Sequence, residues 1–165
     1  MADILTRILE TKRREVNQLR GRLDDLKSAA RDASPPRGLA RALERPEGTP
    51  LRVMAECKRR SPSAGVIAAP YIPVQIASTY QVAGANAVSC LTDCEYFGGA
   101  IEHLAEIRAV VELPVLRKDF LIDESQIYEA RAAGADGVLL IAEALEAGLR
   151  SDALVEFVDM YPTLA

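Results

Sequence analysis

The sequence predicts an α/β fold with a parallel β-sheet, and two observations lead to this prediction. From residue 51 onward, short apolar segments alternate with longer segments whose apolar residues recur every three or four positions. The short segments are rich in Val, Ile and Leu, as expected for parallel strands covered by helices. The sequence therefore predicts strand–helix units in which each helix forms the crossover to the next strand.

An internal repeat indicates how many units the complete fold would contain. Ala83-Gly-Ala-Asn-Ala-Val88 and Ala133-Gly-Ala-Asp-Gly-Val138 lie 50 residues apart, and in each the glycine is expected to end a helix shortly before a strand. Two units per repeat would give eight units in about 200 residues, which is the scale of a (β/α)8 TIM barrel. The 165 residues accommodate four units, so we expect the first half of such a barrel.

The barrel is expected to occupy residues 51–165, after an amino-terminal helical extension over residues 1–50. Apolar residues at helical spacing predict one long amphipathic helix over residues 4–30, or two helices joined near Gly21. A short helix, Leu39–Leu43, is expected before the first strand.

The barrel segment divides into four predicted strand–helix units. The strands are Val53–Lys58, Ala87–Leu91, Val115–Lys118 and Gly137–Ile141, and the helices that follow them are Val74–Ala83, Ile101–Val111, Glu124–Ala133 and Ser151–Met160. Tyr161–Ala165 leaves the fourth helix as if a fifth strand were to begin. An open four-stranded sheet would leave two edges unpaired, so we expect a half-barrel that needs a complementary carboxyl-terminal half or associates with itself.

Composition narrows the class of protein. The chain is 49% hydrophobic and 27% charged with a net charge of −4, which suits one soluble domain and opposes binding to nucleic acid. The cluster Lys12-Arg13-Arg14 alternates with acidic residues and is expected to be a solvated helix face. No apolar run is long enough to span a membrane, so we expect a cytoplasmic protein. Three cysteines fit a reducing compartment, Cys57 and Cys90 are expected in the core, and no metal site is predicted.

Charged side chains gather where the first predicted strand ends. Glu56 and Lys58 are two residues apart, so their side chains point to the same face of the strand. Val53, Ala55 and Cys57 take the opposite, apolar face, which can pack against helices. The arrangement fits a functional site, and it fits equally an edge strand with one solvated face.

Lys118 places a third charged group at the end of another predicted strand. In a barrel it would point inward, beside Glu56 and Lys58. A lysine next to another cation and partly desolvated can donate a proton near neutral pH, a carboxylate can orient it, and a second lysine can hold an anion. The alternative is an ordinary surface lysine at a strand end. Arg117 and Asp119 fall on the helix side, where we expect them to pair with each other or with a helix.

Neighbouring residues would complete a pocket around these charges. The loop Ser61-Pro-Ser-Ala-Gly65 offers hydroxyl groups and backbone amides to a phosphate or carboxylate, and such loops are also common without a ligand. Phe97, Phe120 and Leu139 would supply apolar walls, and each also fits an ordinary core position.

Four motifs resemble those of the indole-3-glycerol phosphate synthase family. They are Ala55-Glu-Cys-Lys-Arg-Arg-Ser-Pro-Ser63, Ser89-Cys-Leu-Thr-Asp-Cys-Glu-Tyr-Phe-Gly-Gly99, Pro114-Val-Leu-Arg-Lys-Asp-Phe120 and Gly134-Ala-Asp-Gly-Val-Leu-Leu-Ile141. The first and third are highly specific, whereas the Gly-Ala-Asp motif recurs in many barrels. With the amino-terminal Ile8-Leu-Glu-Thr-Lys-Arg-Arg-Glu-Val16, the resemblance covers nearly the whole chain.

The resemblance implies a (β/α)8 barrel with its helical extension over the active site, no cofactor, and a phosphorylated small molecule as substrate. The family closes the indole ring on 1-(2-carboxyphenylamino)-1-deoxyribulose 5-phosphate in tryptophan biosynthesis, releasing carbon dioxide and water. By motif, Lys118 is expected to be the general acid that protonates the ribulose carbonyl, Glu56 its acidic partner, and Lys58 the cation that holds the substrate anion. The expected substrate pocket consists of Ser61, Pro62, Ser63, Phe97, Phe120 and Leu139.

The chain departs little from the family pattern where the two can be compared. Cys57 and Cys90 replace aliphatic residues, and Gly98-Gly99-Ala100 stands where a polar residue, Gly and often Ser are usual. The family's later strands carry a second catalytic glutamate, an Asn-Arg pair and a Gly/Ser-rich phosphate site, which cannot be placed here. We therefore expect the chain by itself to carry the acid side of the site, meaning the general acid Lys118 with Glu56, without the base side that includes the second catalytic glutamate.

Overall fold

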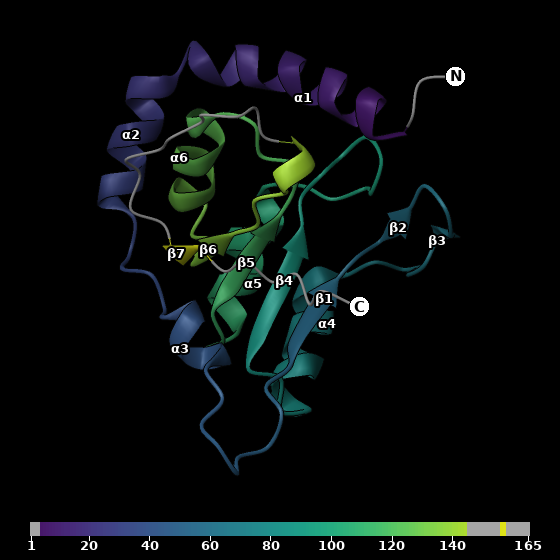
Figure 1. The fold of residues 1–165 in the computed structure, drawn as a ribbon, viewed down its shortest axis with the longest axis vertical. Helices are drawn as coiled ribbons and strands as arrows, with labels where there is room; N and C mark the ends of the chain where they lie inside the picture. Colours follow the sequence, from purple (N-terminus) through teal and green to yellow (C-terminus); the bar gives the residue numbers. More distant parts are fainter. Residues whose placement is uncertain (1–3, 145–155, 158–165) are drawn as a thin grey trace.

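An open parallel sheet forms the framework of the protein (Figure 1). The computed structural model describes residues 4–144 and 156–157. The strands lie side by side in sequence order, as β1 (Met54–Cys57), β4 (Ala87–Leu91), β5 (Val115–Lys118), β6 (Gly137–Val138) and β7 (Glu156–Phe157). All neighbouring strands are parallel, as in a barrel, and among the described residues the sheet does not close. The predicted α/β class is confirmed.

Helices cover the outer face of the sheet and lie at both ends of its strands. α4 (Pro73–Val82) packs on β1, α5 (Glu102–Val110) on β5 and α6 (Glu124–Ala132) on β6. α1 (Ile4–Arg20) lies across the carboxyl ends of the strands, α2 (Leu23–Asp32) packs against α6, and α3 (Leu39–Leu43) lies toward the amino ends (Figure 1).

The alternation of side chains along the strands divides the buried residues into two clusters. The larger cluster lies between the sheet and its covering helices and includes Val88, Cys57 and Cys90. The smaller cluster lies on the inner face and contains Leu39, Ala87 and Leu116, packed against Leu43, Met54 and Leu139. The consecutive residues Ala87 and Val88 fall in different clusters, as the period of two requires. Both cysteines lie in the core, as predicted.

The internal repeat has the same structure at both of its occurrences. Gly84 and Gly134 have φ angles of +88° and +89° and end α4 and α6, as the sequence predicts. Asn86 Oδ1 then accepts a hydrogen bond from the backbone N–H of Val53 at 2.9 Å, and Asp136 Oδ2 accepts one from Val115 at 2.8 Å. The fourth residue of the repeat thus ties the start of one strand to the start of its neighbour.

The helical extension differs from its prediction in the role of one residue. It forms two helices separated at Gly21 and Arg22, in agreement with the two-helix alternative. Arg13 and Arg14 are exposed, but Lys12 is only 1% exposed, so the prediction of a solvated face was wrong at this position. Lys12 interrupts the apolar stripe of α1 because its ion partners lie beneath the helix.

Three predictions around the strands need correction. The loop after Lys58 forms a hairpin of β2 (Arg60–Ser61) and β3 (Gly65–Val66), whose backbone groups pair with each other. Val53 was expected to face helices but is 50% exposed, because it precedes the paired segment of the edge strand β1. The predicted strand Gly137–Ile141 ends at Val138 and leads into the short 3₁₀ helix η1 (Ala142–Ala144).

The fourth predicted helix, Ser151–Met160, lies largely outside the described residues. Glu156–Phe157 is described and forms β7 beside β6, so the helix prediction was wrong at these two positions. Pairing with β6 supplies hydrogen-bond partners to an otherwise open strand edge, and the β-branched and aromatic residues of this stretch favour a strand.

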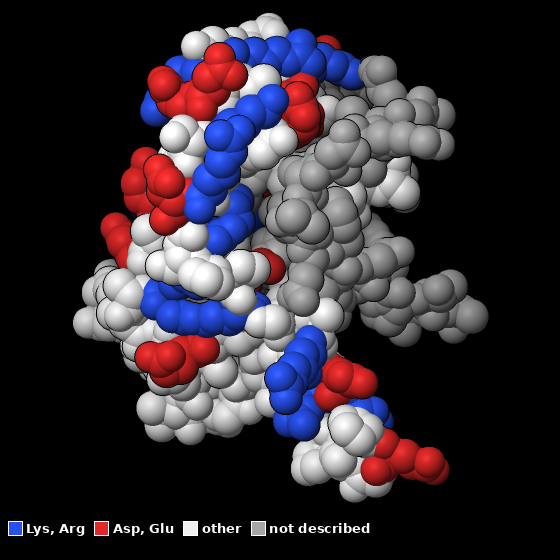
Figure 2. Space-filling view, turned by 90° about the vertical axis from the view of Figure 1, so that its left-hand side faces the viewer, with Lys and Arg blue, Asp and Glu red and all other residues white. Residues whose placement is uncertain are grey.

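Charged side chains on the described surface are mixed in sign. Figure 2 shows the face toward α2, where basic side chains are interspersed with acidic ones. Among the described helices, none combines the length and apolar character needed to cross a bilayer.

Candidate active site

Glu56, Lys58 and Lys118 meet at the carboxyl ends of the strands, on the inner face of the sheet. The two carboxylate oxygens of Glu56 are divided between the lysines, Oε1 pairing with Lys58 and Oε2 accepting a hydrogen bond from Lys118. Lys118 reaches Glu56 across β4, which separates β5 from β1. The side chain of Glu56 is 25% exposed, so the three groups form a partly buried cluster and not a solvated edge.

The two lysines keep the carboxyl group of Glu56 ionised. Burial alone raises the pKa of Glu56, but the hydrogen bonds and charges of Lys118 and Lys58 outweigh burial and lower the pKa below its ordinary value. One carboxylate thus faces two ammonium groups, and the cluster carries a net positive charge that suits an anion.

Ser89 lies between these charges and was missed by the sequence analysis. It pairs with Glu56 and with Leu116 in the strand register, so its side chain occupies the inner face of β4. Its small size leaves room for the Lys118–Glu56 bridge, and its buried hydroxyl has no hydrogen-bond partner among the described residues. The alternation along β4 is the signal that could have found it.

The aromatic walls of the predicted pocket lie together. Phe97 and Phe120 come from the loops after β4 and β5, and their ring centroids are 6.2 Å apart with the planes tilted by 33°. Leu139 packs with the inner cluster, near Leu116 and Met54. All three are partly exposed, which leaves apolar surface available to a ligand.

The predicted polar loop does not join the charged cluster. Ser61 is the last residue of β2, and Pro62 and Ser63 lie in the turn of the β2–β3 hairpin and are exposed. Ser61 Oγ accepts a hydrogen bond from the Ala64 backbone at 3.1 Å and lies 3.4 Å from Ser63 Oγ. The hydrogen bonds described for these hydroxyls therefore stay within the hairpin.

A buried ionic network lies under α1, on the outer side of the strands. Arg117 pairs with Asp119 at 3.1 Å and with Glu129 of α6 at 2.8 Å, which confirms both predicted kinds of partner. Lys12 lies 2.9 Å from Asp119 and 2.9 Å from Asp93. We call Lys12, Asp93, Asp119 and Arg117 the Lys12 cluster.

Within the Lys12 cluster, the ion partners of Asp119 and Lys12 favour the ionised forms of these two groups. Burial alone raises the pKa of Asp119, but Arg117 and Lys12 lower it to about 2. Burial likewise disfavours a charged Lys12, and the charges of Asp119 and Asp93 raise its pKa above the ordinary value. Sequence analysis missed Lys12 and Asp93 as partners, although a lysine inside an apolar helix stripe was the available signal.

Gly99 fixes the path of the loop that carries Phe97. A Cβ atom at this position would overlap the backbone carbonyl of Leu91. The backbone N–H of Gly99 donates to Asp93 O at 2.7 Å, and Gly98 adopts a φ of +67°. The loop therefore requires glycine at position 99.

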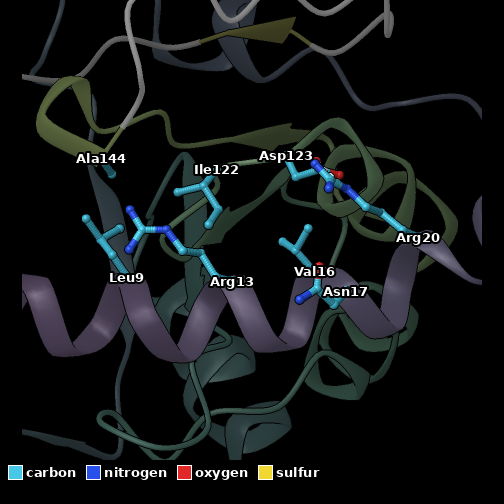
Figure 3. A pocket seen from close by; sticks show the side chains of 8 residues that line it. All are labelled: Leu9, Arg13, Val16, Asn17, Arg20, Ile122, Asp123 and Ala144. Carbon is cyan, nitrogen blue, oxygen red and sulfur yellow. Dashed lines mark hydrogen bonds and ion pairs between the residues drawn. The ribbon is translucent and has the colours of Figure 1, made fainter.

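A separate cavity of about 410 Å³ lies between α1 and the segment after β5 (Figure 3). Its lining comprises Leu9, Arg13, Val16, Asn17 and Arg20 of α1 together with Ile122, Asp123 and Ala144. Arg20 spans one end of this lining and pairs with Asp123 at 2.5 Å. Glu56 and Lys118 do not line this cavity.

Comparison with known proteins identifies the family. The family model described as indole-3-glycerol phosphate synthase matches residues 5–159. The chain belongs to the indole-3-glycerol phosphate synthase family. It therefore belongs to a TIM-barrel enzyme family, as both the repeat and the motifs predict.

Three curated indole-3-glycerol phosphate synthases show how much of a family member the chain represents. The protein of Chlorobium phaeovibrioides is 49% identical over 147 residues, which are 86% of this chain and 55% of that protein. The protein of Chloroherpeton thalassium is 45% identical over 163 residues, which are 97% of this chain and 61% of that protein. The protein of Leptospira interrogans is 45% identical over 142 residues, which are 86% of this chain and 52% of that protein. The chain thus spans somewhat more than half the length of these indole-3-glycerol phosphate synthases.

Proposed function

We propose that this chain supplies the acid side of an indole-3-glycerol phosphate synthase active site and acts with a complementary carboxyl-terminal part. The observation that carries the proposal is the pairing of Lys118 and Lys58 with one carboxylate, that of Glu56, at the carboxyl ends of the strands. In barrel enzymes this end of the strands carries the catalytic groups.

In this proposal the substrate is 1-(2-carboxyphenylamino)-1-deoxyribulose 5-phosphate. Lys118 donates a proton to the ribulose carbonyl oxygen as the new ring bond forms, while Glu56 orients the ammonium group through their hydrogen bond. Lys58 pairs with an anionic group of the substrate, and loss of carbon dioxide and water then gives the indole ring. Phe97, Phe120 and Leu139 supply the apolar surface for the anthranilate ring.

The hairpin residues Ser61, Pro62 and Ser63 have a separate role in the proposal. They bind the substrate carboxylate only if the hairpin turns toward the Glu56 cluster, since their described hydrogen bonds are internal to the hairpin. Among the described residues, the two serine hydroxyl groups have no hydrogen-bond partner outside the hairpin, so they could bind a ligand there.

Complementation tests the proposed activity. The chain would be co-folded with the part of the Chlorobium phaeovibrioides relative that follows the matched residues, and indole product followed by fluorescence. Lys118→Ala should lower kcat by about 10²- to 10⁴-fold, as for loss of a positioned general acid. Lys27→Ala is the matched control, because Lys27 lies on α2 over the ring of Tyr128. No product from halves that co-elute and show native circular dichroism would defeat the proposal.

A complementary chain also accounts for the exposed edge of the fold. β1 has a neighbour on one side only among the described strands, and the apolar side chains around it are exposed, namely Leu51, Val53, Val66 and Ile67. We infer that this edge pairs with the complementary part, and light scattering should show a one-to-one complex. A stable homodimer that excludes the added half would favour self-association instead.

The proposed compartment is the cytoplasm. Cys57 and Cys90 are direct partners in the parallel pair of β1 and β4, and both are free thiols. Two unlinked cysteines in neighbouring strands fit a reducing environment.

A further inference from the structure

Lys12 connects the helical extension to both loops that carry the aromatic walls. Its ammonium group lies 2.9 Å from a carboxylate oxygen of Asp93, in the loop after β4, and 2.9 Å from one of Asp119, directly after β5. All three side chains are at most 2% exposed. A single cation of α1 therefore joins two loops that are distant in the sequence.

Each of the two aspartates in turn holds the backbone of a phenylalanine. Asp93 Oδ1 accepts hydrogen bonds from the N–H groups of Tyr96 at 2.7 Å and Phe97 at 3.0 Å. Asp119 Oδ1 accepts one from the N–H of Phe120 at 2.9 Å. The ammonium group of Lys12 is thus one hydrogen-bonded residue away from each member of the aromatic pair.

Other contacts of α1 reach the same loop but lie nearer its surface. Thr11 Oγ1 lies 3.3 Å from Glu95 Oε2 and 3.3 Å from Tyr96 Oη. Arg14 approaches Glu95 at 3.9 Å, with 73% of the arginine side chain exposed. Exposed ion pairs contribute little to stability, so the buried contacts of Lys12 contribute most to holding α1 against the loop.

We propose that Lys12 is a positioning residue for substrate binding: by joining Asp93 to Asp119 it sets the separation of Phe97 and Phe120 across the active site. This inference rests on the proposed function, in which the two rings contact the substrate. The helical extension then acts on the reaction through the aromatic pocket, without itself supplying a catalytic group.

Kinetics of the complemented chain test this role. Lys12→Met should lower kcat/KM by about 10²-fold, mainly through KM, because misplacing a substrate contact by about 1 Å has effects of that size. Lys118→Ala should act mainly on kcat, so the two variants are separated by the parameter that changes. Arg7→Met is the matched control, since Arg7 is an exposed cation of the same helix.

A double variant distinguishes positioning from mere charge neutralisation. In Lys12→Met/Asp93→Asn the buried negative charge of Asp93 is removed, while the asparagine oxygen can still accept from the N–H groups of Tyr96 and Phe97. If Lys12 only neutralises buried charge, the double variant should regain the original KM. If Lys12 positions the loops, KM should stay raised because the link from α1 to the loop is absent.

A fluorescence measurement tests the geometry independently of activity. The chain contains no tryptophan, so Phe97→Trp introduces a single tryptophan reporter into it. Adding Lys12→Met, or Lys12→Met/Asp93→Asn, to this variant should shift its emission to the red and increase acrylamide quenching, whereas Arg7→Met should change neither. If the unaltered complemented chain makes no indole product while the fluorescence changes, the proposed function fails and the loop geometry stands. Unchanged fluorescence, or a KM unchanged in Lys12→Met, would overturn the positioning role.

Discussion

Replacement of Asp136 and Asn86 offers a matched test of what holds the amino ends of the strands. The two residues are the fourth positions of the same repeat, and each accepts a hydrogen bond from the start of a neighbouring strand. Their surroundings differ, because Asp136 is 1% exposed whereas Asn86 is only partly buried. The repeat therefore supplies two substitutions with the same local geometry and different burial.

The structure indicates how much each substitution should cost. Asp136→Ala removes the acceptor for the backbone N–H groups of Arg37, at 2.6 Å, and Val115, at 2.8 Å, and removes the ion partner of Arg108. An unpaired buried donor costs about 1–3 kcal/mol and a broken buried ion pair about 3–5 kcal/mol. These effects overlap, so we expect the free energy of unfolding to fall by roughly 4 kcal/mol or more. Asn86→Ala removes one hydrogen bond near water and should cost about 0.5–1.5 kcal/mol.

Urea unfolding followed by far-UV circular dichroism measures the difference. Transition midpoints, with slopes compared between variants, give the change in the free energy of unfolding. Asp136→Asn retains an acceptor oxygen and should lie between the two alanine variants, so the ranking can be tested even if Asp136→Ala does not fold. Equal losses for Asp136→Ala and Asn86→Ala, or a smaller loss for Asp136→Asn than for Asn86→Ala, would refute the reasoning.

Three further predictions concern the loops and the core. Gly99→Ala should markedly lower the melting temperature, because the added methyl group overlaps a backbone carbonyl that cannot move without distorting β4. Since the pKa of Asp119 is lowered from 3.8 to about 2, the stability it contributes, about 2 kcal/mol, is present above pH 3.8 and lost as pH falls toward 2. Urea midpoints of Asp119→Asn should therefore fall less steeply over this interval than those of the unaltered chain. Burial raises the thiol pKa of Cys57 and Cys90 to about 12, so a thiol reagent should modify exposed Cys94 quickly and these two only on unfolding.

Local patterns predicted the strands and helices of the middle of the chain well. The strands Ala87–Leu91 and Val115–Lys118 have the predicted bounds, and the helices from α3 to α6 begin and end within one residue of their predictions. The spacing of apolar residues and the glycine after each of two helices depend only on neighbouring residues, so a single sequence reveals them. The same alternation placed Lys118 and Glu56 on one face, and Arg117 and Asp119 on the other.

What the sequence did not reveal depends on contacts between distant segments. Lys12 is buried because Asp93 and Asp119 lie beneath α1, and no local pattern shows which carboxylates those will be. The hairpin after Lys58 forms by backbone pairing over a short loop with weak strand propensity, so alternation gave no signal for it. The strand at Glu156–Phe157 is likewise set by the open edge of β6, which overrides the helical spacing around it.

The alternation along β5 separates two charge clusters that differ in burial and in their balance of charge. Lys118 points to the inner face, where Glu56 and two lysines leave an excess of positive charge. Its neighbour Asp119 points outward into the Lys12 cluster, where every charge is buried and already has an opposite partner. Breaking any ion pair of a balanced, buried cluster is costly, so its side chains keep their positions. A partly exposed cluster with excess positive charge instead attracts an anion. The exchange of Lys118 and Asp119 would leave the composition of the chain unchanged and would abolish both arrangements. Position along the strand, more than charge content, therefore determines which charge lies on the inner face and which lies in the buried Lys12 cluster.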